Sequence, residues 1–505
     1  MLPLYGSRKI LCDGIPRRDL LQIGGLGALG LTTTDFSRLA AAQPDSTRGD
    51  SAKRGGSFGK AKSCILIFPF GSPPQHETFD PKPEAPREIQ GEMKAAATSV
   101  AGIDFCEHLP KTAKVADRMT VVRSMTHPYP VHGVAYALTG MPTYTPAIEA
   151  SPRAQEHWPF IGSAVDYIER ARSSGQVPPV PRNIGLPWRF GSKSTVPTLA
   201  GPYAAFLGAA YDPVWTDFEG RGTKIVPKLT DGQTADVRDP FAGIAPGGKF
   251  RLTDGGELPK ELTIEQLGLR RSLKSQFDQA RHWLQADPQV DSFDEHRRLA
   301  WSLLATNKVR AALDFEQETL AMRERYGLTL FGQSCLVARR LVEAGAKFVS
   351  VFWDPFEPFG GSCWDTHANH FPRLKDYLLP VFDDAYSALL ADLDERGLLD
   401  ETLVLNMSEH GRTPQIDNKP KGAARHHWSR VYSATLAGGG TARGQVVGRS
   451  DARGGDVADT PVSPKDLLAT TLHLLGIDGE ATVPDRLGRK LAIAGDGRVR
   501  HELLG

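Results

Sequence analysis

Carboxylate and imidazole side chains occur in pairs at two points of the chain, each after an apolar, β-branched run. Asp365 and His367 form the first pair, Glu409 and His410 form the second, and His427 lies a short distance downstream. Carboxylate oxygens and neutral imidazole nitrogens are ligands of zinc and of other hard or borderline divalent cations. These residues therefore predict a metal site, with zinc as the expected ion and calcium or manganese as alternatives.

The apolar runs that precede these pairs are typical of buried strands. They span Lys347 to Trp353 and Thr402 to Met407, and the residues from Leu374 to Arg396 between them show helical periodicity. This order predicts a βαβ unit, in which both strands run parallel. A further run, Ser63 to Phe70, leads into the polar loop that carries Glu77. Since the strand ends of an open α/β sheet carry its site residues, we expect these side chains to converge at one edge.

The alternation of strand and helix patterns predicts one large α/β domain over residues 63–505. We expect a large, mostly parallel sheet with helices on both faces. Residues 260–326 have helical periodicity and many charges four residues apart, which predicts a helical insertion. The stretch from Thr143 to about Leu258 is rich in Pro, Gly and aromatic residues. We expect it to be an excursion over the sheet rather than a separate core.

The N-terminus has the features of an export signal. Arg17 and Arg18 form a twin-arginine pair, followed by a short, glycine-rich apolar stretch and a small-residue cleavage site at Ala40 to Ala42. Residues 1–42 are therefore predicted to be a twin-arginine signal peptide, and residues 43–62 a flexible lead-in. This predicts passage through the Tat translocase and a periplasmic or extracellular location. The alternative is an N-terminal helix with two exposed arginines.

Composition argues against some classes of partner. The chain has 505 residues with 60 basic and 59 acidic side chains, a balance that gives no electrostatic case for binding nucleic acid or an anionic membrane. No stretch of the mature chain approaches the ~18 uncharged apolar residues that a membrane span requires. Four cysteines remain after removal of the signal, and their wide spacing predicts no disulfide connectivity.

Several motifs occur in an order that resembles a known family. They are the twin-arginine leader, Gln75 to Pro83, Ser124 to Gly140, Trp364 to His367, Glu409 to Pro414, His427-Trp428 and Ala437 to Gly440. Together they resemble the exported bacterial proteins called domain of unknown function 1501, a family placed in the alkaline phosphatase/sulfatase superfamily. The resemblance runs over nearly the whole mature chain. It implies an alkaline phosphatase-like fold and a metal-dependent hydrolase of phosphate or sulfate esters.

The resemblance also implies two metal ions. Their ligands, carried over by position, are Asp365, His367 and His427 for one ion and Glu409, His410 and Glu77 for the other. His76 stays an alternative to its neighbour Glu77. Of the adjacent pair His426-His427, we assign His427 because it matches the His-Trp motif of the family. Two cations about 4 Å apart can clamp an oxyanion and lower the pKa of a bound water.

The attacking group is not evident from the sequence. In the superfamily it precedes the helix that here ends at Gly140, but the segment from Thr126 to Gly133 contains no Ser or Cys. Three routes stay open: attack by Thr126, a role for His132 as nucleophile or acid/base, or attack by metal-bound hydroxide. Arg412 is predicted either to bind the oxyanion through its two-pronged guanidinium or to form a structural ion pair.

These observations predict an exported metal-dependent hydrolase that acts on a small-molecule or polysaccharide ester of phosphate or sulfate. The alternative is a metal-stabilised extracytoplasmic binding or scaffold protein without turnover. The missing Ser and Cys favour this alternative. The clustering of titratable residues at several strand ends favours the enzyme.

Overall fold

The computed structural model describes residues 56–129, 132–141, 151–152, 154, 156–173, 178–194, 200–228, 233–253, 307–354, 356, 363–419 and 422–505. The predicted signal peptide, residues 43–55 of the predicted lead-in and residues 260–306 of the predicted insertion lie outside the described residues. The chain divides into two units, Met1–Gly56 and Ser57–Gly505, and the features below belong to the second.

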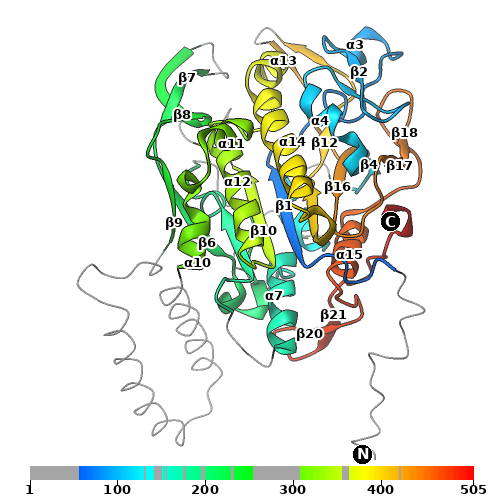
Figure 1. Cartoon of the computed structure of the whole chain (residues 1–505). Helices are drawn as coiled ribbons and strands as arrows, with labels where there is room; N and C mark the ends of the chain where they lie inside the picture. Colours follow the sequence, from blue (N-terminus) through cyan, green and yellow to red (C-terminus); the bar gives the residue numbers. More distant parts are fainter. Residues whose placement is uncertain are drawn as a thin grey trace, which may run out of the picture. The chain divides into compact units, whose positions relative to one another are not determined.

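A nine-stranded sheet forms the centre of this unit (Figure 1). Strand β1 (Ser63–Pro69) lies between β10 (Phe348–Trp353) and β11 (Thr402–Asn406) and runs parallel to both. All residues of these three strands are buried. Their sequences are nearly continuous apolar runs because helices cover both faces of a parallel sheet.

The remaining strands extend the sheet on both sides, in the order β17-β4-β16-β11-β1-β10-β5-β6-β9. They are β4 (Met119–Met125), β5 (Asn183–Leu186), β6 (Val214–Glu219), β9 (Lys249–Leu252), β16 (Tyr432–Ala437) and β17 (Gln445–Val447). Strand β16 is antiparallel to both neighbours and β9 is antiparallel to β6, whereas the other pairings in the sheet are parallel. The predicted large, mostly parallel sheet is confirmed.

Two long helices cover one face of the sheet. They are α12 (Leu330–Glu343) and α14 (Leu379–Glu395), drawn in front of the central strands in Figure 1. Their buried side chains share one hydrophobic core with Ile65 and Ile67 of β1. Because alternate side chains of a strand point to opposite faces, the neighbours of these residues must enter a different core.

That second core lies under the helices of the opposite face. It contains Leu66 and Phe68 of β1 together with buried residues of α5 (Val134–Thr139), α7 (Ile161–Arg172) and α15 (Pro464–Leu474). The predicted covering of both faces by helices is therefore confirmed. Two further short helices are α3 (Arg87–Gln90) and α4 (Pro110–Lys114).

The segment between β10 and β11 contains the predicted crossover helix. It consists of α13 (His370–Arg373), a π-helical turn (Leu374–Leu378) and α14. The π-helical turn directly precedes the start of α14, where Pro380 has no backbone hydrogen to donate to the preceding turn. The predicted helix from Leu374 to Arg396 is confirmed, and it carries the chain from one parallel strand to the other.

Residues expected to lie over the sheet contribute strands to it instead. Within the stretch from Thr143 to Leu258, β5, β6 and β9 build one edge of the sheet. In the same stretch β7 (Gly222–Lys228) and β8 (Gln233–Ile244) form an antiparallel hairpin. Strands as short as β5 give too few residues for a period to be recognised, so the sequence pattern was uninformative here.

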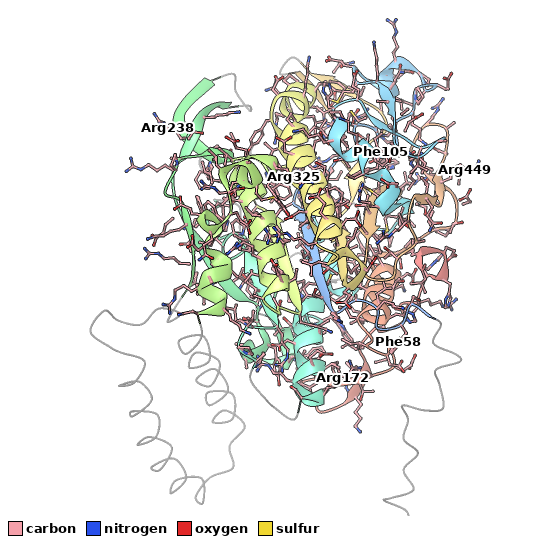
Figure 2. All side chains as sticks on the ribbon, viewed as in Figure 1. Phe58, Phe105, Arg172, Arg238, Arg325 and Arg449 are labelled. Atoms are coloured by element: carbon pink, nitrogen blue, oxygen red, sulfur yellow. The ribbon has the colours of Figure 1, made fainter. Side chains whose placement is uncertain are left out.

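Residues 307–326 of the predicted insertion form α10 (Lys308–Leu313) and α11 (Leu320–Arg325), joined by a 3₁₀ turn. Within the described ranges, no helix combines the length and the apolar character needed to cross a membrane. Figure 2 shows side chains filling the space between sheet and helices; Phe105 lies inside and is fully buried, whereas Arg449 points outward.

Besides the β7–β8 hairpin, the described residues form five further two-stranded sheets. They pair β2 (Ala95–Ala97) with β3 (Asp104–Cys106), β12 (Gly411–Arg412) with β15 (His427–Trp428), β13 (Asp417–Lys419) with β14 (Gly422–Ala424), β18 (Arg449–Ser450) with β19 (Val457–Asp459), and β20 (Thr482–Pro484) with β21 (Lys490–Ala492). The pairing of β12 with β15 matters for the site, because it sets Arg412 opposite His427.

Candidate metal centre

The residues with metal-binding side chains follow strands that end at the same edge of the sheet. Asp365 and His367 follow β10, Glu409 and His410 follow β11, and His132 follows β4. These strands run in one direction, so their carboxyl ends meet at one edge, where α/β folds place their sites. The predicted convergence of strand ends is therefore seen in the structure.

Asp365, His367 and His427 form a compact group of three potential ligands. The Nε2 atom of His367 lies 2.9 Å from Nε2 of His427 and 2.9 Å from Oδ1 of Asp365. The third side of the triangle, from Nε2 of His427 to Oδ1 of Asp365, is 3.3 Å. Ligand atoms bound tetrahedrally at ~2.0 Å from zinc are about 3.3 Å apart, so these three atoms fit one ion.

A second group contains His132, His410 and again His427. In His410 the Nδ1 atom donates to the carbonyl oxygen of Gly411 across 2.8 Å. Its Nε2 atom is buried and has no hydrogen-bond partner. Burial holds the pKa of His410 well below its usual value, so the ring is neutral. The tautomer fixed by Gly411 leaves a bare lone pair on Nε2, which is the form that binds a metal or accepts a proton.

The carboxylate of Glu409 is completely buried and is engaged by three donors. Its Oε1 atom accepts from the backbone nitrogen of Gly71 across 2.8 Å and from Nδ1 of His132 across 2.9 Å. Its Oε2 atom accepts from the hydroxyl of Ser408 across 2.6 Å. Burial alone would raise the pKa of Glu409, but the hydrogen bond and charge of His132 lower it to about 2.

His132 lies between two carboxylates. Besides its contact with Glu409, its Nε2 atom is 3.4 Å from Oδ2 of Asp365. Burial lowers the pKa of His132, but the hydrogen bonds to Asp365 and Glu409 outweigh burial and raise it to about 9. His132 also packs edge-on against His427, with ring centroids 4.2 Å apart.

Glu77, predicted as a ligand of the second ion, has other partners in the structure. Its carboxylate contacts the guanidinium of Arg425, with the Nη2–Oε1 distance at 2.5 Å, and Nε2 of His370 at 3.2 Å. Both ends of the Glu77–Arg425 pair are fully buried. Burial raises the pKa of Glu77, but the charges of Arg425 and His370 outweigh it and lower this pKa to about 2. Its neighbour His76 donates from Nε2 to the carbonyl of Arg453.

Among the described residues, neither potential metal-binding group includes Glu77, His76 or Glu409. The structure thus brings Asp365, His367 and His427 together as potential ligands. It groups His410 with His132 and His427, and the carboxylate of Glu409 contacts His132. The sequence signal for Glu77 was its position after β1. A carboxylate at such a position can also form structural ion pairs between loops.

Arg412 is buried and its guanidinium contacts protein atoms. Its Nη2 atom lies 2.5 Å from Oδ1 of Asp365 and also contacts the carbonyl of Gly71, while Nε and Nη1 reach the carbonyls of Ser72 and Arg425. Of the two roles predicted for Arg412, this geometry corresponds to the structural ion pair. The residue aligns Asp365 with the loop that follows β1.

Thr126, predicted as one of the nucleophiles, directly follows β4. Its backbone nitrogen donates to Val462, and it lines a cavity of about 930 Å³ together with Tyr129 and Tyr136. The next residue, His127, is the one that reaches the site, because its Nε2 atom donates to the backbone oxygen of Glu409 across 2.7 Å. His127 was visible in the sequence only as one of several polar residues after β4.

Three supporting residues were missed by sequence reasoning. Ser72 has a positive φ of 70°, rare for a residue other than glycine, and its hydroxyl accepts from the backbone nitrogen of His410 across 3.2 Å. Arg425 and His370 hold Glu77, as described above. The positive φ of Ser72 has no sequence signal, whereas Arg425 could have been found as a charged residue directly before His426-His427.

Gly71 explains how closely two of the loops approach each other. Its φ is 95°, and a Cβ atom at this position would lie 2.3 Å from the backbone nitrogen of Asp365. Only glycine fits, both for its conformation and for its space. The loop after β1 therefore packs its backbone against the loop after β10, and the Gly71 nitrogen donates to Oε1 of Glu409.

Residues 61–504 match the family described as "Protein of unknown function (DUF1501)". No curated protein matches this sequence. Solved structures with a similar fold include the PsFucS1 sulfatase from Pseudoalteromonas sp., at 12% identity and a TM-score of 0.37, over 84% of this chain and 69% of that one. Phosphonate monoester hydrolase SpPMH from Silicibacter pomeroyi is similar at 13% identity and a TM-score of 0.31, over 88% and 76% of the chains.

A protein of the alkaline phosphatase superfamily from Vibrio parahaemolyticus is similar at 11% identity and a TM-score of 0.33, over 87% of this chain and 69% of that one. At identities and TM-scores this low, such likenesses fix no activity for this chain. Its chemistry has to follow from its own residues.

Proposed function

This chain belongs to the DUF1501 family, and from its site we propose that it is an exported, metal-dependent hydrolase of phosphate or sulfate esters. The observation that carries the proposal is the triangle formed by Oδ1 of Asp365 and the Nε2 atoms of His367 and His427. Two imidazole nitrogens face each other at 2.9 Å with a carboxylate oxygen beside them, an arrangement suited to a divalent cation and expected to be stable when one is bound.

The residues around this triangle support ester hydrolysis. A divalent cation, when bound, lowers the pKa of water and withdraws charge from an ester oxygen. His132 holds a proton at Nε2, steered by Glu409 at its other nitrogen, and can donate it to a leaving oxygen. His410 offers the unpartnered Nε2 lone pair as a proton acceptor. Arg412 keeps Asp365 oriented and ionised.

Direct attack by water is the route we favour over a covalent intermediate. Burial raises the pKa of the thiols of Cys64, Cys106 and Cys335, which therefore offer no thiolate. The hydroxyls of Ser72 and Ser408 are buried and hydrogen-bonded to the chain. Within the described residues, neither potential metal-binding group contains a Cys.

The absence of Ser and Cys from the segment Thr126 to Gly133 also supports the second candidate function, a metal-stabilised extracytoplasmic binding or scaffold protein. The experiment that separates the two is elemental analysis of the purified exported protein, followed by a panel of phosphate and sulfate esters that includes sulfated polysaccharides. The variant His427→Ala and the control His501→Ala, a histidine in the C-terminal 3₁₀ turn, should be assayed beside it.

We expect wild-type protein and His501→Ala to hold metal and to hydrolyse at least one ester, and His427→Ala to do neither. Metal binding without hydrolysis of any ester would favour the binding-protein function. Protein that folds and takes up no metal under saturating zinc would reject both candidates.

A further inference from the structure

We propose that this site binds one metal ion per chain, in the Asp365–His367–His427 triangle. The His132–Glu409 pair occupies the position where the ligands of a second ion would have to lie. The proposal rests on the metal-binding part of the proposed function and concerns its stoichiometry. It departs from the two ions that the resemblance to the alkaline phosphatase superfamily implies.

The first argument is that the two potential ligand groups are not independent. Both contain His427, and each needs it to reach three ligands. The Nε2 atom of His427 is already 2.9 Å from Nε2 of His367 and 3.3 Å from Oδ1 of Asp365. An ion in the triangle therefore takes this nitrogen and leaves the other group with His132 and His410 alone.

The second argument is that the carboxylates expected to hold a second ion are engaged. Glu409 accepts hydrogen bonds at both oxygens, from Gly71, His132 and Ser408. Turning it toward an ion would strip these donors from a fully buried carboxylate and leave the Gly71 nitrogen without its partner. Glu77 is held by Arg425 and His370, and removing it would leave the buried guanidinium of Arg425 without a counter-charge.

The third argument is electrostatic. The carboxylates of Asp365 and Glu409 carry two negative charges, and the guanidinium of Arg412 beside Asp365 already offsets one of them. A second divalent cation would meet no further carboxylate, since among the described residues the two groups contain only Asp365. Uncompensated positive charge is costly in a partly buried site of this kind.

In a site with one ion, His132 and Glu409 acquire a different role. Glu409 fixes the proton on Nδ1 of His132 and so sets the direction of its Nε2 atom, as outer-shell carboxylates do for imidazoles. His410, oriented by Gly411, keeps its Nε2 lone pair for a proton of bound water or substrate. His132 and His410 are then positioned to act on a substrate beside the bound ion, and neither holds a second ion.

The test is zinc titration of the full exported chain, with loosely bound zinc removed by gel filtration and the zinc-to-protein ratio measured by elemental analysis and native mass spectrometry. We expect a ratio of one. A ratio of two overturns the proposal while leaving a hydrolase intact, and a ratio of zero overturns it together with the proposed metal dependence. One ion without ester hydrolysis supports this proposal and counts against the proposed enzyme.

Three variants locate the ion. His367→Ala should lose zinc, whereas His410→Ala should still saturate at one ion; the reverse pattern would place the ion in the other group and overturn the assignment. Glu409→Gln should also saturate at one ion, because Glu409 contacts His132 and none of the three residues of the triangle. Circular dichroism of each variant, with His501→Ala as control, separates loss of a ligand from loss of the fold.

Discussion

The imidazole of His132 donates from Nδ1 to Oε1 of Glu409 across 2.9 Å, and this bond joins two strands that are not neighbours in the sheet. His132 follows β4 and Glu409 follows β11, and β16 lies between these strands and runs the other way. The carboxyl ends of β4 and β11 therefore flank the start of β16. The loop after β4 thus reaches past this intervening strand and brings an imidazole to Glu409 and to Oδ2 of Asp365.

A second contact secures the same connection. His127, also in the loop after β4, donates to the backbone oxygen of Glu409, so this loop holds both the main chain and the side chain of one residue. A carboxylate held this way cannot move freely between partners. The His132–Glu409 pair is therefore better suited to orienting a proton than to binding and releasing a substrate.

We expect the Glu77–Arg425 pair to contribute to folding stability and to have little effect on metal binding. Glu77→Gln leaves the fully buried guanidinium of Arg425 without a counter-charge, and loss of one partner of a buried pair costs about 3–5 kcal/mol. Urea unfolding should show this loss, while the zinc-to-protein ratio of the folded variant stays at the wild-type value.

The matched control for this variant is Glu156→Gln. Glu156 pairs with Arg486 at the surface, where both side chains are about half exposed, so the cost should be at most about 1 kcal/mol. If Glu77→Gln is no more destabilised than Glu156→Gln but loses zinc, then Glu77 is a ligand, as the sequence motif suggested.

Asp354, directly after β10, should make stability fall as pH rises from 4 toward neutrality. Its carboxyl is fully buried, and burial outweighs the hydrogen bonds from Trp188 and Gly191 to raise its pKa from 3.8 to about 7. Because the folded state keeps a proton that the unfolded state releases, the stabilisation is complete below pH 3.8 and is lost as pH rises through 7.

The measurement is the urea midpoint of wild type and Asp354→Asn between pH 4 and pH 8. Asn cannot ionise, and its carbonyl can accept hydrogen bonds from Trp188 and Gly191. The stability of the variant relative to wild type should therefore increase as pH rises. Parallel pH profiles for the two proteins would show that Asp354 ionises normally in the folded state.

The sequence located the parts of the site that depend on local order along the chain. Asp365, His367, Glu409 and His410 follow long, fully buried strands, and such apolar runs are recognisable without a structure. The parallel direction of β10 and β11 followed from the helix between them, and it placed the two pairs at one edge.

What the sequence could not provide depends on the order of strands in the sheet. Strand β16 separates β4 from β11 in the sheet, and His132 after β4 contacts Glu409 after β11. This contact joins segments nearly 280 residues apart in the sequence. The assignment of Glu77 followed the superfamily pattern, whereas its pairing with Arg425 depends on where the β13–β14 hairpin folds back. The short strand β5 and the positive φ of Ser72 leave no pattern to read.

Export should require the twin-arginine pair, which lies outside the described residues. Replacing Arg17 and Arg18 with Lys keeps the charge but removes the guanidinium pair that a twin-arginine signal requires. The precursor should then accumulate in the cytoplasm, which cell fractionation and immunoblotting would detect. Replacing Arg48 and Arg54, downstream of the predicted cleavage site, with Lys is the control, and processing of both proteins at the same rate would argue against this route.

His132 should contribute to turnover without holding the metal. His132→Ala removes a group that can donate a proton from Nε2, and loss of a positioned acid/base lowers kcat by ~10²–10⁴. Zinc content should stay at the wild-type ratio, because the triangle of Asp365, His367 and His427 is intact. The readouts are kcat, KM and zinc content on whichever ester the panel identifies.

A comparison with Thr126→Val decides how attack occurs. Thr126 lines a cavity whose lining includes none of the residues of the two ligand groups, so its loss should leave kcat within a few-fold of wild type. If Thr126→Val instead abolishes turnover, Thr126 is the nucleophile and the loop after β4 must rearrange when substrate binds. If His132→Ala loses zinc in proportion to activity, His132 is a ligand, and metal binding and proton transfer are not carried by separate residues. If Nε2 of His132 is a proton donor, His132→Ala should lower kcat and retain zinc. The variant should also lose the decrease in kcat that wild type shows at high pH, where the donor is deprotonated.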